Sequence, residues 1–208
     1  MNNAVAFHEN ESLKQAFLRG AGLADDAVAA LTPELMELLG KLTASSLQGA
    51  IDLLALRSLV KQEVKADVTV VVVRNNNPLK FFPDSQTVLT QMLRKKMPGF
   101  MEPIEALEDA WHDLRGHQLG VVAGTRASMD SLMHRLDPAR IEQALAPAGL
   151  LERLLPARRP AAAWDLYQHQ YGSAARDLSD PFKGVFGTSF LAAYEQEVER
   201  LERAGHHG

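Results

Sequence analysis

The segment RNNNPLKFF, residues 74–82, lies between the only strand-like run of the chain and the long helical patterns that follow it. Three consecutive asparagines disfavour a helix because their side-chain amides compete for nearby backbone groups, and Pro78 biases Asn77 away from helical backbone angles. Phe81 and Phe82 follow at once, and docking of these rings on the surrounding helices would order the segment. The sequence therefore predicts a structured loop at 74–82 that is anchored at its aromatic end.

Upstream of this loop, β-branched residues fill positions 68–73, which favours a short extended segment near residues 67–74. Further upstream, Thr32 followed by Pro33 is a typical helix start, because the hydroxyl can cap the helix and proline is tolerated at the first helical position. A stripe of leucines then continues to Val60 and widens in its second half. We expect one long helix whose second half has neighbours on more than one side.

Downstream of the loop, residues 104–136 hold the longest regular pattern of the chain, with apolar side chains spaced by three and four residues. Trp111 lies on this stripe, and so do the polar residues Gln118 and Thr125. A polar side chain on a buried face needs a hydrogen-bond partner. We therefore expect Trp111, Gln118 and Thr125 to be structural anchors inside a helix bundle.

Three glycines recur at every fourth position beside this stripe, namely Gly116, Gly120 and Gly124. In a membrane protein this spacing would suggest helix dimerisation. In a chain without a membrane-spanning pattern, we interpret it as the close approach of a crossing helix.

Further helical patterns occupy residues 84–96 and 161–178, and a last one ends near Leu201. No internal repeat or low-complexity linker interrupts them. The predicted fold class is all-α, a multi-helix bundle that forms a single domain over residues 1–208, with possible lobes at 10–80 and 81–204.

The composition makes several classes of function improbable. The 208 residues carry 22 Lys and Arg against 26 Asp and Glu, a net charge of −4, so no overall positive field draws the chain to nucleic acid or anionic lipid. Cysteine is absent, which leaves neither disulfides nor thiolate metal sites. The first residues lack an export signal, and no apolar stretch approaches about 18 residues. We expect a cytoplasmic protein without membrane insertion.

One cluster has the character of a metal site, and it falls on a single expected helix. Its members are Glu105, Glu108, Asp109, His112, Asp113 and His117. Asp109 and His112 have the three-residue spacing of di-metal carboxylate bundles, but no second carboxylate precedes a histidine by three residues elsewhere in the chain. We interpret the cluster as a solvated charged face and predict no metal. A helical metal-binding or enzymatic domain that uses residues 105–117 is the alternative.

No phosphate loop, nucleophile elbow or dinucleotide-binding motif is present. We therefore expect no enzymatic activity and no cofactor.

The polar half of the loop has two interpretations. Its amides and cations would suit recognition of a peptide or of an acidic segment of a partner protein. Alternatively, the asparagines only cap and bond neighbouring backbone groups. The candidate partner-binding residues are Arg74, Asn75, Asn76, Asn77 and Lys80. Phe81 and Phe82 are the candidate anchors, and we expect at least one of the two rings to be buried.

Several motifs are distinctive in combination. They are SLKQAFLRGAGL (12–23), NNNPLKFF (75–82), PGF (98–100), AWHDLRGHQLGVVAG (110–124), LDPARIEQ (136–143), WDLYQHQY (164–171) and FGTSFLAAYEQEV (186–198). Together they resemble the C-terminal domain of the forkhead-associated (FHA) scaffold proteins of type VI secretion systems.

This resemblance implies a non-enzymatic, cytoplasmic scaffold domain that docks the FHA protein onto other components of the secretion apparatus. In such proteins a phosphothreonine-reading β-sandwich, of about a hundred residues for that class of fold, is joined to the helical part. No run of strands in this sequence matches that module, so we expect it to be absent from these residues and assign them no phosphothreonine binding. A homo-oligomerisation domain is a further alternative.

Overall fold

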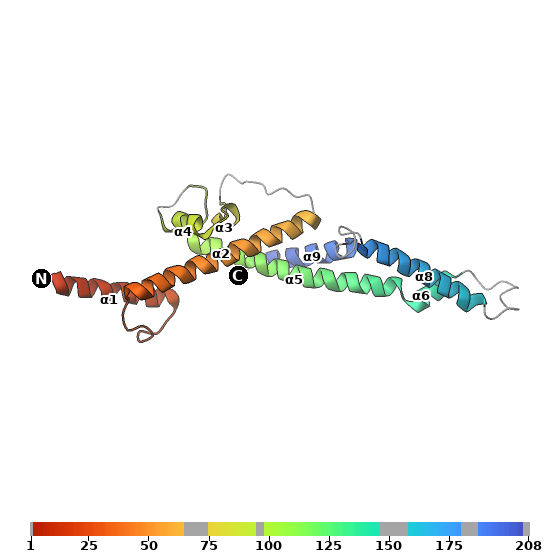
Figure 1. The fold of residues 1–208 in the computed structure, drawn as a ribbon, viewed down its shortest axis with the longest axis horizontal. Coiled ribbons are helices and arrows are strands. Elements are labelled where there is room, and N and C mark those ends of the chain that lie inside the picture. The colour runs from red at the N-terminus through yellow and green to blue at the C-terminus, as the bar shows by residue number, and fades with distance from the viewer. Residues whose placement is uncertain (1, 65–74, 95–97, 146–157, 180–186, 206–208) are drawn as a thin grey trace.

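The computed structural model describes residues 2–64, 75–94, 98–145, 158–179 and 187–205 (Figure 1). Within these ranges every regular element is a helix, which confirms the predicted all-α class. The extended segment predicted at 67–74, including Arg74, lies outside the described residues. The helices are α1 (Asn2–Ala21), α2 (Pro33–Val64), α3 (Pro78–Phe81), α4 (Ser85–Leu93), α5 (Pro103–Arg135), α6 (Pro138–Ala144), α8 (Arg158–Ser179) and α9 (Thr188–Gly205).

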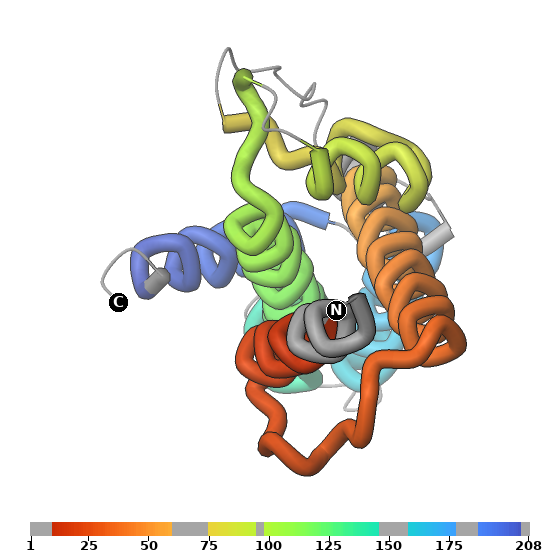
Figure 2. Tube along the Cα trace, turned by 90° about the vertical axis from the view of Figure 1, so that its left-hand side faces the viewer, coloured from red at the N-terminus to blue at the C-terminus, as the bar shows by residue number. Residues whose placement is uncertain are grey.

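The helices form an elongated molecule (Figure 1). The long helices α2 and α5 meet near its middle, and the short α3 and α4 lie against this junction. Helix α9 runs beside α5, and α6 packs with α8 at the end away from α1. In the view along the long axis, α9 and α2 lie on different sides of α5 (Figure 2). Helix α5 is therefore the element that connects the parts of the fold.

Helix starts agree with the capping signals of the sequence. Helix α2 begins at Pro33, and the backbone N–H of Leu35 donates to Thr32 Oγ1 at 3.2 Å. Helix α4 begins after Asp84, whose carboxylate accepts from the backbone N–H of Thr87 at 2.8 Å. These caps satisfy N–H groups that have no partner within the helix.

The hydrophobic core lies where α2, α3, α4 and α5 meet. Its buried side chains are Leu47, Ile51 and Leu54 of α2, Leu79 of α3, Val88 of α4, and Ala110 and Leu114 of α5. Leu79 is only 1% exposed, so the segment predicted as a loop contributes a core residue from a short helix of its own. The core thus fixes the position of residues 77–82 relative to α2 and α5.

Helix α9 packs on the glycine row of α5. Gly116, Gly120 and Gly124 are all buried. A Cβ atom at Gly124 would lie 2.6 Å from the ring of Phe190, and one at Gly120 would lie 2.7 Å from the ring of Tyr194. The glycines therefore let aromatic rings of α9 lie against the backbone of α5, which confirms the predicted close approach of a neighbouring helix.

The prediction for the polar residues of α5 was wrong. Gln118 and Thr125 are exposed, and Trp111 is 45% exposed, so none of them is a buried anchor. Thr125 Oγ1 donates to the Val121 carbonyl of its own helix at 2.8 Å. The physical reason is that α9 packs on the glycines, so the buried face of α5 is rotated away from the stripe of large side chains.

Candidate protein-interaction site

Asn77 starts α3 and holds it in place. Its backbone is extended, with φ −80° and ψ 117°, and its Oδ1 accepts from the backbone N–H of Leu79 at 2.9 Å. Pro78 occupies the first helical position, where its missing N–H costs nothing. The helix ends where the backbone N–H of Phe82 donates to the Pro78 carbonyl at 3.0 Å. A single turn of helix is thereby defined at both ends.

The residues before α3 pair with the turn that precedes α5. The backbone N–H of Asn76 donates to the Gly99 carbonyl at 2.8 Å, and the Asn76 carbonyl accepts from the N–H of Met101 at 3.0 Å. This is an isolated parallel bridge between Asn76 and Phe100. Gly99 has a φ of +94°, a backbone conformation that favours glycine. The PGF turn thus brings Phe100 to the aromatic end of the loop.

A row of polar side chains on α5 receives the loop. Glu105, Asp109, Asp113 and His117 are four residues apart and therefore lie along one side of the helix. Each of the four bonds a group from another part of the chain.

The first two carboxylates of this row bind the asparagines. Asn75 Nδ2 donates to Glu105 Oε1 at 3.3 Å. Asn77 Nδ2 donates to Asp109 Oδ2 and to the Ala106 carbonyl, both at 2.7 Å. Asn77 is only 6% exposed, so its side-chain amide bonds groups inside the protein and does not face solvent.

Lys80 extends the contact along the same row. Its Nζ lies 2.7 Å from Asp109 Oδ2 and 2.8 Å from Asp113 Oδ2. On the other side of Asp113, an Nη atom of Arg57 from α2 lies 3.4 Å from Oδ2. Two carboxylates of α5 thus face one cation of α3 and one of α2, and the three helices are joined by charge as well as by the core.

The pKa values of this network are shifted in the directions that its ion pairs require. Burial alone would lower the pKa of Lys80, but its hydrogen bonds to Asp109 and Asp113, together with their charges, outweigh burial and raise the pKa. Burial alone would raise the pKa of Asp109, but its bonds to Asn77 and Lys80 and the nearby positive charge lower the pKa. Both groups are charged at neutral pH.

At the last position of the row, His117 meets α9. Its Nδ1 lies 3.0 Å from the Tyr194 hydroxyl, and the two rings pack edge to face with centroids 5.8 Å apart. Burial and the charge of Arg57 lower the pKa of His117, which keeps the imidazole neutral at pH 7. His117 therefore contributes to the packing of α5 against α9.

The acidic and histidine cluster is used for internal contacts. Within the described ranges, no group of three His, Asp or Glu side chains is arranged to hold a metal ion. Glu105, Asp109 and Asp113 instead accept bonds from amides and cations of the same chain. These three carboxylates are therefore not part of the fully solvated face that the sequence suggested.

Three phenylalanine rings meet beside the loop. The centroids of Phe81, Phe82 and Phe100 are each 5.5 Å from the other two. Phe82 is half-buried, stacks on Phe100 and packs against the core. Phe81 meets both other rings edge-on and leaves 51% of its surface exposed. The triad therefore holds one aromatic ring at the surface in a defined orientation.

The expectation that at least one of the two rings is buried was wrong, because Phe81 is exposed and Phe82 is only half-buried. Asn77 follows the second interpretation, in which the asparagines cap and bond neighbouring backbone groups. Asn77 was a candidate partner-binding residue, but it is buried and bonded to α3 and α5. Lys80 is engaged by two carboxylates, and Asn76 is half-buried against Gly99. Of the candidates in the described residues, Asn75 is the one with both an exposed side chain and no ion pair. Phe81, predicted to be an anchor, presents its ring to solvent.

Other side chains at this site were not predicted. Asp109 and Asp113 fix Lys80, and Phe100 supports Phe81. The four-residue spacing of Asp109 and Asp113 places both on one face of a helix, but it does not indicate which cation they face. The contact between Phe81 and Phe100 depends on the backbone bridge between Asn76 and Phe100. The sequence carries no periodic signal for this bridge.

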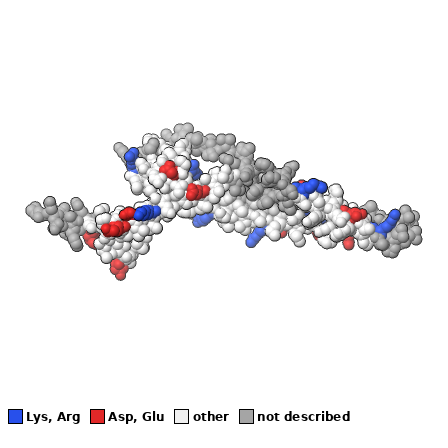
Figure 3. All heavy atoms as spheres, viewed as in Figure 1, with Lys and Arg blue, Asp and Glu red and all other residues white. Residues whose placement is uncertain are grey.

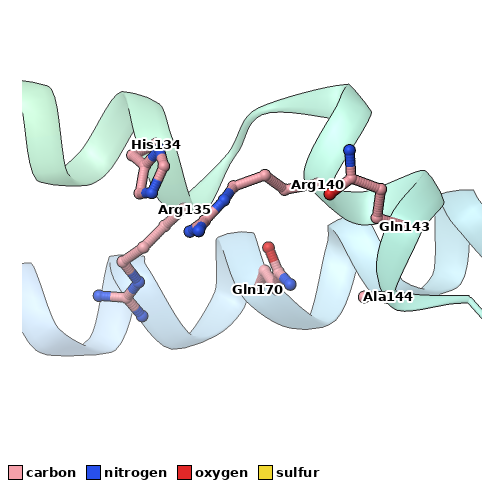
Figure 4. Close-up of a pocket in the computed structure, with 6 residues that line it drawn as sticks. All are labelled: His134, Arg135, Arg140, Gln143, Ala144 and Gln170. Carbon is pink, nitrogen blue, oxygen red and sulfur yellow. The ribbon is translucent and has the colours of Figure 1, made fainter.

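Elsewhere, a pocket of about 500 Å³ lies between the α5–α6 turn and α8 (Figure 4). It is lined by His134, Arg135, Arg140, Gln143, Ala144 and Gln170. Arg140 reaches back toward the end of α5, and Arg135 pairs with Asp177 at 3.0 Å. On the visible face of the molecule, acidic and basic side chains are interspersed (Figure 3).

A comparison with protein families identifies the chain. The family model for the C-terminal domain of Type VI secretion system FHA protein matches residues 19–197. The chain belongs to this family. The matched range contains the loop, the acidic row of α5 and the aromatic rings of α9, so every contact described above lies within the FHA C-terminal domain. No curated protein and no solved structure matches the chain. Among the described residues of this FHA C-terminal domain, no helix is both long and apolar enough to cross a membrane.

Proposed function

We propose that this domain is a non-enzymatic protein-interaction domain that docks the FHA protein onto another cytoplasmic component of the type VI secretion apparatus. Phe81 is the central contact, and the exposed amide of Asn75 is a polar contact at its rim. The observation that carries the proposal is the half-exposed Phe81 ring, which is fixed in place by Phe82, Phe100 and the bonded turn of α3.

Pre-organisation supports this assignment. Binding costs less free energy when the contacting side chains are already ordered. The position of α3 is set by Asn77 and by Lys80, which bonds two carboxylates of α5. The Phe81 ring follows Lys80 directly and packs edge-on against two other rings. Large aromatic side chains held in this way are typical hot spots of protein interfaces.

Lys80 and Asn76 complete the proposed surface in a supporting role. About a third of the Lys80 side chain is exposed beside Phe81, while its ammonium group is paired with two carboxylates. Because the ion pairs with Asp109 and Asp113 already neutralise Lys80, we expect Phe81 to contribute more affinity than Lys80.

The test is a binding experiment with the full chain and each of the other secretion components. A pull-down first identifies the component that the chain retains, and calorimetric titration then gives its affinity. Phe81→Ala should weaken binding by at least about 30-fold, the loss expected for a hot-spot residue. Its melting temperature should fall only slightly, since half of the ring is already in water.

Trp164→Ala is the matched control. Trp164 lies on α8 and is 58% exposed, so its removal deletes an aromatic ring of similar exposure far from α3 along the chain. Affinity should be unchanged in this variant. If Trp164→Ala weakened binding while Phe81→Ala did not, the docking surface would have to be reassigned to α8. Retention of no component by the wild-type chain would contradict the docking role itself.

A further inference from the structure

Helix α2 has an apolar face that no other described element covers. Leu47, Ile51 and Leu54 face the core. On the other side, Leu38, Leu42, Leu53 and Leu56 are 51%, 54%, 46% and 58% exposed. Leu38 and Leu56 each lie nine residues from Leu47, which at about 100° per residue places them opposite the core. The helix thus has two apolar faces, and only one of them is used within the described chain.

The middle of this outer face is narrow and uncharged. Ser45, Ser46 and Gly49 lie between the two pairs of leucines, and all three are exposed. A Cβ atom at Gly49 would meet nothing within 4 Å. Small residues flanked by leucines allow the backbone of a second helix to approach closely, with the leucines packing at either end.

The face has an internal symmetry centred on position 47. Leu38 and Leu56 are equally far from this centre, and so are Ser45 and Gly49. Leu42 and Leu53 match to within one residue. In an antiparallel pair of identical helices related by a two-fold axis, positions equally far from the centre lie opposite each other. Leucines of one copy would then lie opposite leucines of the other, and serine would lie opposite glycine.

Two opposite charges at the edge of the outer face lie at nearly equal distances from position 47. Lys41 lies six residues before the centre, and Asp52 lies five residues after it. At about 100° per residue they fall on the same edge of the outer face. Within one copy, Lys41 pairs with Glu37, and Asp52 accepts a hydrogen bond from Gln48. In the dimer, Lys41 of one copy would also approach Asp52 of the other, and this pair would occur twice. A like-charge arrangement would have opposed the contact.

From the leucine face, its symmetry and its edge charges, we propose that a second copy of this chain binds here, through an antiparallel contact between the two α2 helices. The helix has 32 residues and is about 48 Å long at about 1.5 Å per residue. A single pair of helices lies at the lower end of the interface sizes of stable complexes, about 1,200 Å². The expected dimer is therefore reversible. It does not involve Phe81, so the same dimer forms whether or not the docking site on α3 is used.

Sedimentation equilibrium of the full chain over a wide concentration series tests the dimer. Leu42→Lys and Leu53→Lys place a charge in the contact and should each weaken dimerisation at least tenfold. Leu93→Lys is the matched control, because Leu93 is 81% exposed on α4 and lies outside the face. It should leave the dimer unchanged. Circular dichroism confirms that each variant remains helical. A wild-type chain that stays monomeric at every concentration, or a dimer insensitive to both leucine substitutions, would overturn the proposal.

The orientation has a test of its own, because the chain contains no cysteine. Ser45→Cys and Gly49→Cys are made separately. An antiparallel pair should give more disulfide-linked dimer from the mixture of the two variants than from either variant alone. Stronger linkage within each variant alone would indicate a parallel pair and refute the antiparallel geometry. Lys41→Glu should weaken the dimer, and adding Asp52→Lys should restore it. Failure of this restoration would overturn the assigned register.

Discussion

At the scale of single residues, the position of α3 depends on the side chain of Asn77. Its Oδ1 caps the helix, while its Nδ2 bonds the Ala106 carbonyl and Asp109. An alanine at this position would leave a buried carbonyl and a backbone N–H without these partners, and unpaired buried polar groups are costly. The Asn77 side chain thus connects the loop to α5 through buried hydrogen bonds.

We expect Asn77→Ala to lower the free energy of unfolding by about 2 to 4 kcal/mol, the sum of a lost cap and lost buried hydrogen bonds. Asn75→Gly is the control. Asn75 is exposed and has a φ of +65°, which glycine adopts without strain, so this variant should change stability by less than about 1 kcal/mol. Urea unfolding measures both values. If Asn77→Ala were as stable as the wild type, the proposed role of Asn77 in holding α3 against α5 would be refuted.

The carboxylate of Asp109 gives the network a dependence on pH. Its pKa in the folded chain is below the ordinary value of 3.8, so the charged form is the one that the fold stabilises. Its contribution to stability is therefore complete above about pH 4 and is lost as the pH falls through the lower, folded pKa.

We expect Asp109→Asn to be less stable than the wild type at about pH 6 and to approach its stability as the pH falls through the lowered, folded pKa of Asp109. Urea unfolding across this range measures the difference. Asp165→Asn, which changes an exposed carboxylate on α8, serves as the control and should show no such convergence. A difference between Asp109→Asn and wild type that stayed constant throughout this fall in pH would contradict the ion pairs.

At the scale of elements, α5 determines which helices meet. One side carries the acidic row that bonds the loop and α2, and the glycine row receives the rings of α9. Phe190 is 1% exposed and lies against Gly124, so its ring has little room to move. The contact between α5 and α9 therefore requires glycine at this position.

Gly124→Ala should lower the free energy of unfolding by roughly 1 to 2 kcal/mol, because overpacking against Phe190 exceeds the gain of about 1 kcal/mol in helix propensity. Gly116→Ala is the matched substitution, one in which the new Cβ would meet nothing within 4 Å. It should be neutral or stabilising. Thermal melts compare the two variants, and a stabilised Gly124→Ala would show that α9 does not pack closely on the glycines.

Several features of the helices could be predicted from the sequence. Capping residues predicted the starts of α2 at Pro33 and of α4 after Asp84, and residue spacing predicted the all-α class and the close approach at the glycines of α5. The buried face of α5 could not be predicted in this way, because the apolar pattern consists of large side chains and glycine contributes nothing to it. Trp111 and Thr125 lie on that pattern and nevertheless face outward.

For the loop, local preferences indicated correctly that Asn77 is not helical and that a bend occurs. They did not indicate that Asn77 would be buried, since its partners Ala106 and Asp109 lie about thirty residues away in the sequence. The direction of Phe81 likewise depends on Phe100, which is brought near by a single bridge. Contacts between distant residues carry no periodic signal, so the sequence indicated neither the burial of Asn77 nor the exposure of Phe81.

At the scale of the whole molecule, the core draws side chains from α2 and α3 on one side of residue 80 and from α4 and α5 on the other. We propose on this basis that residues 1–208 form a single cooperative domain. The extension formed by α6 and α8 is joined to the rest through the long helix α5.

The two tryptophans of the chain report on two parts of the molecule, since Trp111 is near the core on α5 and Trp164 is on α8. In Trp111→Phe and Trp164→Phe, fluorescence follows one region at a time. A single domain predicts that the two thermal transitions coincide with each other and with the loss of helicity. Separate transitions would show that α8 unfolds independently and would contradict the proposal of one domain.

The central claim is that Phe81 is the contact with another secretion component and that the asparagines hold it in place. Hydrogen exchange of the full chain, alone and bound to the component retained in the pull-down, tests it most directly. The claim predicts that the backbone N–H groups of residues 80–82 and 100–101 gain the strongest protection on binding. Protection confined to α8 and α9, with these N–H groups unchanged, would contradict it.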